Sequence, residues 1–114
     1  MKITTTQVDG KSLLKIAGEL RIGSVADAKT AILASLADSS ELQLDLSEVD
    51  QCDTAGIQLL LMTCASARAR GKRFVTLGHT AALQAALTRA GIPVELLAYR
   101  TDEPGNGQGS DAGA

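Results

Sequence analysis

The chain has 114 residues, of which 45% are apolar, so it is long enough for one domain with a single hydrophobic core. Its aromatic residues are one Phe and one Tyr, and its formal net charge is −2. Binding of single-stranded nucleic acid usually needs stacked aromatic rings beside a basic groove, and this composition supplies neither. We therefore expect no nucleic-acid partner.

The cysteine spacing argues against a metal site. Cys52 and Cys64 form no Cys-x-x-Cys pair, and the single histidine, His79, has no cysteine near it in sequence. We expect both cysteines to be reduced, at least partly buried and free of metal, where a cysteine behaves as a small apolar residue.

The sequence also lacks the usual signs of membrane insertion. The first residues have no apolar signal-peptide centre, and the longest uninterrupted run of large apolar residues covers only residues 59–62. We expect a cytoplasmic protein without direct membrane insertion.

The first predicted elements are two strands and a helix. Residues 2–8 and 12–17 are β-type runs on either side of Asp9-Gly10, a pair typical of a hairpin turn. Ser24 is expected to cap a helix, with Asp27 three residues further on as a weak capping box. The apolar residues of this helix recur at helical spacing and are Val25, Ala28, Ile32 and Leu36.

Strands and helices alternate from there on. Residues 41–46 alternate leucine with polar residues and predict a strand, and residues 47–53 predict a polar loop. A helix is expected from Thr54, with an apolar stripe of Ile57, Leu60, Leu61 and Cys64. The later elements are a strand over residues 73–77, a helix capped by Thr80 and a last short strand over residues 94–97.

The order β-β-α-β-α-β-α-β predicts an α/β fold, in which a mixed sheet with parallel crossovers is covered by about three to four helices. Residues 1–99 are expected to form the domain. Residues 100–114 are polar and rich in glycine, and we expect them to form a disordered tail. Leu59 and Met62 widen the apolar face of the second helix, so that they either cover a neighbouring helix or meet a partner.

The sequence shows no catalytic pair and no glycine-rich loop of the kinds that hold phosphates. Four acidic residues lie close together in sequence; they are Asp45, Glu48, Asp50 and Asp53. Their spacing is compatible with a divalent cation, but the segment lacks the glycine and the distal glutamate of a calcium loop, so solvated charges are the better interpretation. We expect no enzyme activity, no metal and no cofactor.

The most informative segment is Asp53-Thr54-Ala55-Gly56-Ile57, a polar pair directly before an apolar helical run. One interpretation is an N-cap, in which Asp53 or Thr54 accepts a hydrogen bond from the first helical turn. The other is a switch, because a phosphate on Thr54 would meet the N–H groups of a helix N-terminus and add about −1.5 to −2 charges beside Asp53. The residues alone leave both interpretations open.

Several segments together resemble the STAS domain, which is found in anti-sigma-factor antagonists and in the tails of sulfate transporters. They are Gly18-Glu19-Leu20, Leu44-Asp45-Leu46-Ser47-Glu48-Val49, the run from Asp53 to Leu60, Gly71-Lys72-Arg73-Phe74, and Leu83, Leu87 and Gly91-Ile92. The resemblance covers about residues 1–97. Its most specific part is Asp-Leu-Ser followed by Asp-Thr-x-Gly at this spacing.

This resemblance implies a sheet flanked by helices and a non-enzymatic, protein-binding role. In the antagonists, a partner kinase of the GHKL type phosphorylates the hydroxyl residue that follows the aspartate of Asp-Ser/Thr-x-Gly. Thr54 matches this phosphoacceptor, and Asp53 and Gly56 match its neighbours. The residues expected to bind the partner are Asp53, Thr54, Ala55, Gly56, Ile57 and Gln58.

The resemblance leaves more than one partner open. An anti-sigma factor or a GHKL-type kinase is the first expectation. Threonine at position 54 is also similar to the small STAS subunit of the bacterial ABC transporter for phospholipid trafficking, which docks on the ATPase subunit. STAS adaptors linked to chemotaxis carry a similar run, and in each case we expect the chain itself to be a monomer or a weak homodimer.

Overall fold

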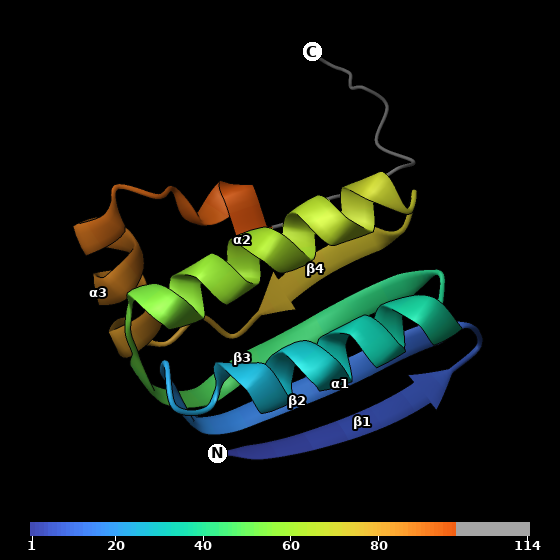
Figure 1. Cartoon of the computed structure of the whole chain (residues 1–114), viewed down its shortest axis with the longest axis horizontal. Helices are drawn as coiled ribbons and strands as arrows, with labels where there is room; N and C mark the ends of the chain where they lie inside the picture. The colour runs from blue at the N-terminus through green and yellow to red at the C-terminus, as the bar shows by residue number, and fades with distance from the viewer. Residues whose placement is uncertain (98–114) are drawn as a thin grey trace.

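The computed structural model describes residues 1–97, and four strands in these residues form one sheet with the spatial order β1-β2-β3-β4 (Figure 1). The strands are β1 (Lys2–Val8), β2 (Lys11–Leu20), β3 (Glu41–Cys52) and β4 (Arg73–Leu77). The helices are α1 (Val25–Asp38), α2 (Thr54–Ala69), α3 (Ala81–Ala90) and the short 3₁₀ helix η1 (Val94–Leu97). The tail predicted over residues 100–114 lies outside the described residues.

The predicted mixed sheet is confirmed. β1 and β2 are antiparallel, whereas β2 with β3 and β3 with β4 are parallel, joined by α1 and by α2. The turn between β1 and β2 uses Asp9 and Gly10, which have φ values of 52° and 78°. Two consecutive positive φ values are the pattern of a type I′ turn, whose twist suits a hairpin, and this explains the Asp-Gly pair.

Helices α1 and α2 lie side by side over one face of the sheet (Figure 1). Alternate residues of the central strands face these helices and are fully buried; they include Leu14, Ile16, Leu42, Leu44 and Leu46. The helices contribute apolar residues to the same core, among them Ile32, Leu36, Ile57 and Leu60. Helix α3 packs against β3 and against α2.

Strand β3 is longer than predicted, because residues 47–52 continue the strand and do not form a polar loop. The pairing of β2 with β3 contains two register shifts, and at each of them β3 has one more residue than β2. An extra residue resets the alternation of inward and outward side chains. The strand pattern that ends at Leu46 therefore resumes out of phase, with Val49 and Cys52 as its buried residues.

The strand predicted over residues 94–97 is wrong, since these residues form η1. Pro93 precedes the segment, and its carbonyl accepts a hydrogen bond from the N–H of Leu96, which closes a helical turn. Leu97 is buried, whereas Leu96 is exposed. The turn that follows Pro93 thus places one leucine, Leu97, in the hydrophobic core.

Candidate functional site

The predicted site lies at one end of the sheet, where β2 and β3 end and where α1 and α2 begin (Figure 1). Asp53 occupies the N-cap position of α2, and Thr54 is the first helical residue. The side chain of Thr54 is exposed, and within the described part of the chain its hydroxyl makes no hydrogen bond.

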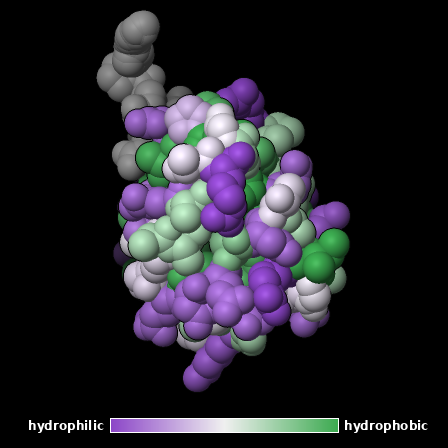
Figure 2. Space-filling view, turned by 90° about the vertical axis from the view of Figure 1, so that its left-hand side faces the viewer, coloured by the Kyte–Doolittle hydropathy of each residue, from purple (hydrophilic) through white to green (hydrophobic). Residues whose placement is uncertain are grey.

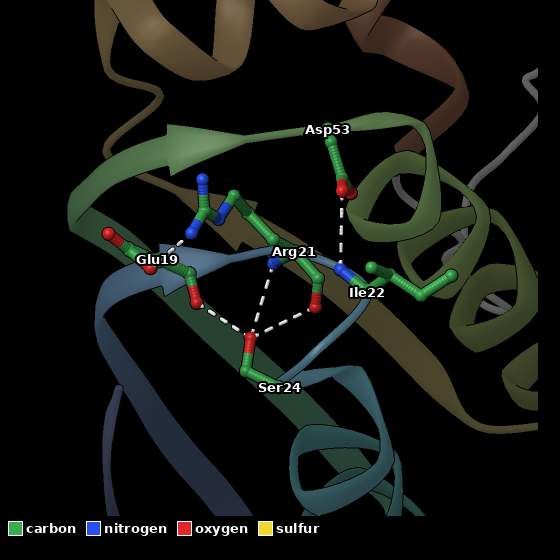
Figure 3. A network of polar contacts seen from close by, with 5 residues as sticks. All are labelled: Glu19, Arg21, Ile22, Ser24 and Asp53. Atoms are coloured by element: carbon green, nitrogen blue, oxygen red, sulfur yellow. Dashed lines mark hydrogen bonds and ion pairs between the residues drawn. The ribbon is translucent and has the colours of Figure 1, made fainter.

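Asp53 binds two segments of the chain at once. One carboxylate oxygen, Oδ1, accepts a hydrogen bond from the N–H of Gly56 at 3.1 Å, which is the N-cap bond. The other, Oδ2, accepts from the N–H of Ile22 at 3.2 Å, in the loop between β2 and α1 (Figure 3). The N-cap interpretation of the sequence therefore holds for Asp53, which also joins the start of α2 to that loop.

The protonation of Asp53 follows from these contacts. Partial desolvation acts to raise the pKa of the carboxyl group, but hydrogen bonds from the backbone N–H groups of Gly56, Ile22 and Ala55 outweigh it. The positive charge of Arg21 acts in the same direction as these bonds. The pKa of Asp53 is consequently below its ordinary value, and the side chain is a carboxylate at neutral pH.

A second set of polar contacts shapes the loop between β2 and α1 (Figure 3). The hydroxyl of Ser24 lies 2.8 Å from the carbonyl oxygen of Glu19 and accepts from the N–H of Arg21. Arg21 and Glu19 form an ion pair at 2.9 Å. Ser24 is the N-cap residue of α1, but its side chain makes no cap hydrogen bond, so the predicted capping box is wrong.

Ile22 is a residue of this end that the sequence analysis did not single out. Its N–H is held by Asp53, while its side chain is 78% exposed. The exposed isoleucine therefore lies beside the carboxylate of Asp53, the residue that immediately precedes Thr54. The only signal in the sequence is a large apolar residue within the otherwise polar segment Arg21–Ser24.

Two of the predicted binding residues face the interior. Ile57 is only 2% exposed and belongs to the core. A Cβ atom on Gly56 would lie 2.4 Å from the carbonyl oxygen of Leu20 and 2.8 Å from Sγ of Cys52, so only glycine fits there. Gly56 and Ile57 hold α2 against the sheet, and the surface is left to Asp53, Thr54, Ala55 and Gln58.

An apolar groove of about 570 Å³ continues from this surface between α1 and α2. Its lining residues are Val25, Ala26, Lys29, Ala55, Gln58, Leu59 and Met62. Leu59 is buried, and Met62 is half-buried. The wide apolar face of α2 therefore forms one wall of this groove beside α1.

Figure 2 looks onto this end of the molecule and shows polar and apolar side chains interspersed. We define the α2 start surface by its exposed and half-buried residues Ile22, Asp53, Thr54, Ala55 and Gln58. It combines one carboxylate, one free hydroxyl and one exposed isoleucine.

Three of the four acidic residues of the predicted cluster make separate contacts. Asp45 accepts from the N–H of Ser47, Glu48 pairs with Lys15, and Asp53 caps α2. Residues 1–97 contain no group of three or more His, Cys, Asp or Glu side chains placed to hold a metal ion. No helix among the same residues is both long and apolar enough to cross a membrane.

Comparison with solved structures shows the same fold in several proteins. An anti-sigma factor antagonist from Mycobacterium paratuberculosis has a TM-score of 0.69 at 23% identity, with 79% of this chain and 77% of that chain covered. A sulfate transporter family protein from Wolinella succinogenes has a TM-score of 0.64 at 26% identity, with coverages of 81% and 75%. The Bacillus cell fate determinant SpoIIAA in its phosphorylated form has a TM-score of 0.65 at 15% identity, with coverages of 80% and 85%.

Comparison of the sequence identifies the family. No protein of curated function matches the sequence significantly. The family described as "Mlab, STAS domain" matches residues 3–98, which is most of the chain. This match agrees with the mixed sheet, the parallel crossovers and the Asp-Thr-x-Gly segment at the start of α2. The chain therefore belongs to the STAS domain family.

Proposed function

We propose that the protein is a non-enzymatic regulator that binds a partner protein through the α2 start surface and is switched by phosphorylation of Thr54. The observation that carries the proposal is the exposed, unbonded hydroxyl of Thr54 at the first residue of a 16-residue helix. A kinase has direct access to such a hydroxyl, and phosphorylation would not require the helix to unfold.

The electrostatics of this end explain how one phosphate would act as a switch. The N-terminus of a helix favours negative charge, so the isolated domain tolerates the phosphate. The phosphate would nevertheless add about −1.5 to −2 charges beside the ionised carboxylate of Asp53. A partner that binds closely over Thr54 would have to desolvate these charges together, and its affinity would fall.

The relatives support a partner of the signalling type. Anti-sigma factor antagonists share the fold, and one of them, SpoIIAA, is known in a phosphorylated form. An anti-sigma factor or a GHKL-type kinase is accordingly the first partner that we propose. The regulator would work in the cytoplasm, where both kinds of protein act.

A second candidate is a subunit that docks on the ATPase of an ABC-type phospholipid transporter. Two observations favour it: the family match carries the description "Mlab", and position 54 is threonine, as in that class of STAS subunit. The docking surface would be the same, whereas phosphorylation would not be needed.

Binding experiments on the full chain test the proposal. The wild-type protein is used to capture partners from an extract of its source organism, and the captured protein is then titrated with purified variants. We expect Thr54→Glu to weaken binding by about tenfold or more, because it places a charge inside the interface. Thr54→Ser keeps the hydroxyl and should bind like the wild type.

The matched control is Thr30→Glu, which makes the same change at an exposed position of α1. Equal loss in Thr30→Glu and Thr54→Glu would show that net charge, not the α2 start surface, controls binding. Capture of an ATPase subunit would favour the second candidate. An unchanged intact mass after incubation with a captured kinase and ATP would remove the phosphorylation step.

A further inference from the structure

Strand β1 presents an open edge of the sheet. It pairs with β2 over its whole length, from Lys2 opposite Ala17 to Val8 opposite Lys11, without a register shift. Among the described residues, nothing lies along its outer side (Figure 1). The strand contains no proline and no bulge, and the only charged residue in it is Lys2, at its first position.

The two edges of the sheet differ. The opposite edge strand, β4, has five residues, and η1 packs against it. Proteins usually protect sheet edges by such shortening or covering, by proline, by bulges or by inward charges, because a regular open edge pairs with another strand. The seven residues of β1 have none of these protections, and three threonines, one isoleucine and one valine give the strand a high β propensity.

The hairpin turn determines which backbone groups of β1 face outward. In a two-residue hairpin the closing pair, here Val8 and Lys11, exchanges hydrogen bonds, and such pairs alternate along the ladder. Thr6 and Thr4 therefore bond to β2. The N–H and C=O groups of Ile3, Thr5 and Gln7 point away from the sheet, evenly spaced along the open edge.

We propose that this edge pairs with β1 of a second copy, antiparallel and with the twofold axis at Thr5. In this register Thr5 faces Thr5 of the second copy, and Ile3 faces Gln7. All residues with outward backbone groups are then paired with one another, as a hydrogen-bonded ladder requires. The two sheets would form one continuous sheet of eight strands, four from each copy.

The side chains suit this register. Lys2 lies opposite Val8 of the second copy, so no two like charges face each other, and Thr4 lies opposite Thr6. Val8 is 61% exposed in the single chain and would be covered in part by the stem of Lys2.

The dimer is expected to be weak and reversible. One pair of seven-residue strands buries less surface than the roughly 1,200–2,000 Å² of a stable interface. None of its residues belongs to the α2 start surface, so this inference does not depend on the proposed function.

Sedimentation velocity of the full chain from about 5 µM to 1 mM tests the pairing, together with hydrogen exchange at both concentrations. We expect a reversible rise in mass toward a dimer. We also expect slower exchange at high concentration for the N–H groups of Ile3, Thr5 and Gln7, with no change for those of Thr4 and Thr6. A chain that remains monomeric up to 1 mM would overturn the proposal and leave the edge to a strand of a different protein.

A charge-swap pair tests the twofold axis. Thr5→Lys and Thr5→Glu each place two like charges opposite each other, and each should be monomeric at concentrations where the wild type dimerises. An equimolar mixture should associate again, because a lysine then faces a glutamate. Thr30→Lys, on α1, is the matched control and should dimerise like the wild type. Unchanged dimerisation of Thr5→Lys, or no association in the mixture, would overturn the proposed register.

Discussion

The two ends of the sheet use polar side chains in opposite ways. At the end where β3 begins, the carboxylate of Glu41 is only 6% exposed and accepts from Arg73 and from Gln43, and Ser12 and Ser39 bond to each other in the interior. At the end where α2 begins, Asp53 is held by backbone N–H groups, and Thr54 next to it stays exposed. Paired polar side chains thus fill the first end, whereas at the second end the backbone holds Asp53 and the hydroxyl of Thr54 stays exposed.

The largest effect on stability is expected at Gly56, where the start of α2 packs most tightly against the ends of β2 and β3. Gly56→Ala should lower the free energy of unfolding by about 3 kcal/mol or prevent folding, because its Cβ would meet the carbonyl oxygen of Leu20 at 2.4 Å. Backbone cannot move aside as the end of a flexible side chain can. Chemical denaturation, followed by circular dichroism, measures the change.

Gly23→Ala is the matched control for this prediction. It makes the same substitution in the adjoining loop, where an added Cβ meets nothing within 4 Å. It should change stability by less than about 0.5 kcal/mol. Equal effects of the two substitutions would mean that loss of glycine flexibility, not close packing at Gly56, is responsible.

The ion pair between the buried Glu41 and the half-buried Arg73, at the other end, should give the next largest effect on stability. Arg73→Ala leaves the carboxylate of Glu41 buried without its main partner and should cost about 2 kcal/mol of unfolding free energy. Glu41→Gln, which removes the charge but keeps a hydrogen-bond acceptor, should cost less. If Arg73→Ala left the unfolding free energy nearly unchanged, the stability of this end of the sheet would not depend on the pairing of Glu41 with Arg73.

The same ion pair predicts a pH dependence. Hydrogen bonds from Arg73 and Gln43 hold the pKa of Glu41 below its usual value despite burial. The unfolded chain has a glutamate pKa of about 4.3, so the pair stabilises the fold fully above that pH and loses its effect as the pH falls through the lower folded value. Denaturation between about pH 6 and 3 should show a shallower loss for Arg73→Ala than for the wild type.

Local sequence signals predicted many features of the two ends of the sheet. They did not predict the contacts between residues that lie far apart in the chain. The Asp9-Gly10 turn and the cap at Asp53 depend on neighbouring residues, so the sequence indicates them directly. Ile22 is held by Asp53 from 31 positions away, and the continuation of β3 depends on bulges opposite β2. Neither arrangement leaves a periodic pattern in the chain.

A smaller effect is expected at the cap of α2. Asp53→Ala removes the acceptor for Gly56 and Ile22 and should lower the melting temperature by about 5 °C. Asp53→Asn keeps one oxygen as an acceptor and should lower it by less. Asp27→Ala, in the first turn of α1, is the control and should change it by less than about 2 °C.

The cap also predicts an acid response at this end. The folded pKa of Asp53 is below the value of about 3.9 in an unfolded chain, so its stabilisation is present above that pH and is lost as the pH falls through the folded value. The melting-temperature difference between Asp53→Ala and the wild type should therefore shrink in acid. A constant difference from pH 7 to pH 3 would contradict a role for the carboxylate charge.

The last expected effect concerns the reactivity of two thiols and not the stability of the fold. Cys52 is the last residue of β3, and Cys64 lies in α2. Neither Cys52 nor Cys64 forms a disulfide among the described residues, and both are buried. Burial raises the pKa of Cys52 to about 11 and that of Cys64 in the same direction. Because the thiolate is the reactive form, a disulfide reagent at pH 8 should modify native Cys52 about 100-fold more slowly than Cys52 in the unfolded protein, and native Cys64 more slowly than unfolded Cys64.

Single-cysteine variants separate the two thiols. Cys64→Ala retains Cys52, next to Asp53, and Cys52→Ala retains Cys64, inside α2. Unfolding in denaturant should expose two reactive thiols in the wild type and one in each variant. Native Cys52 that reacted as fast as an unfolded thiol would show that the start of α2 opens readily. The tight packing of Gly56 against Cys52 and Leu20 would then not describe this end of the protein in solution.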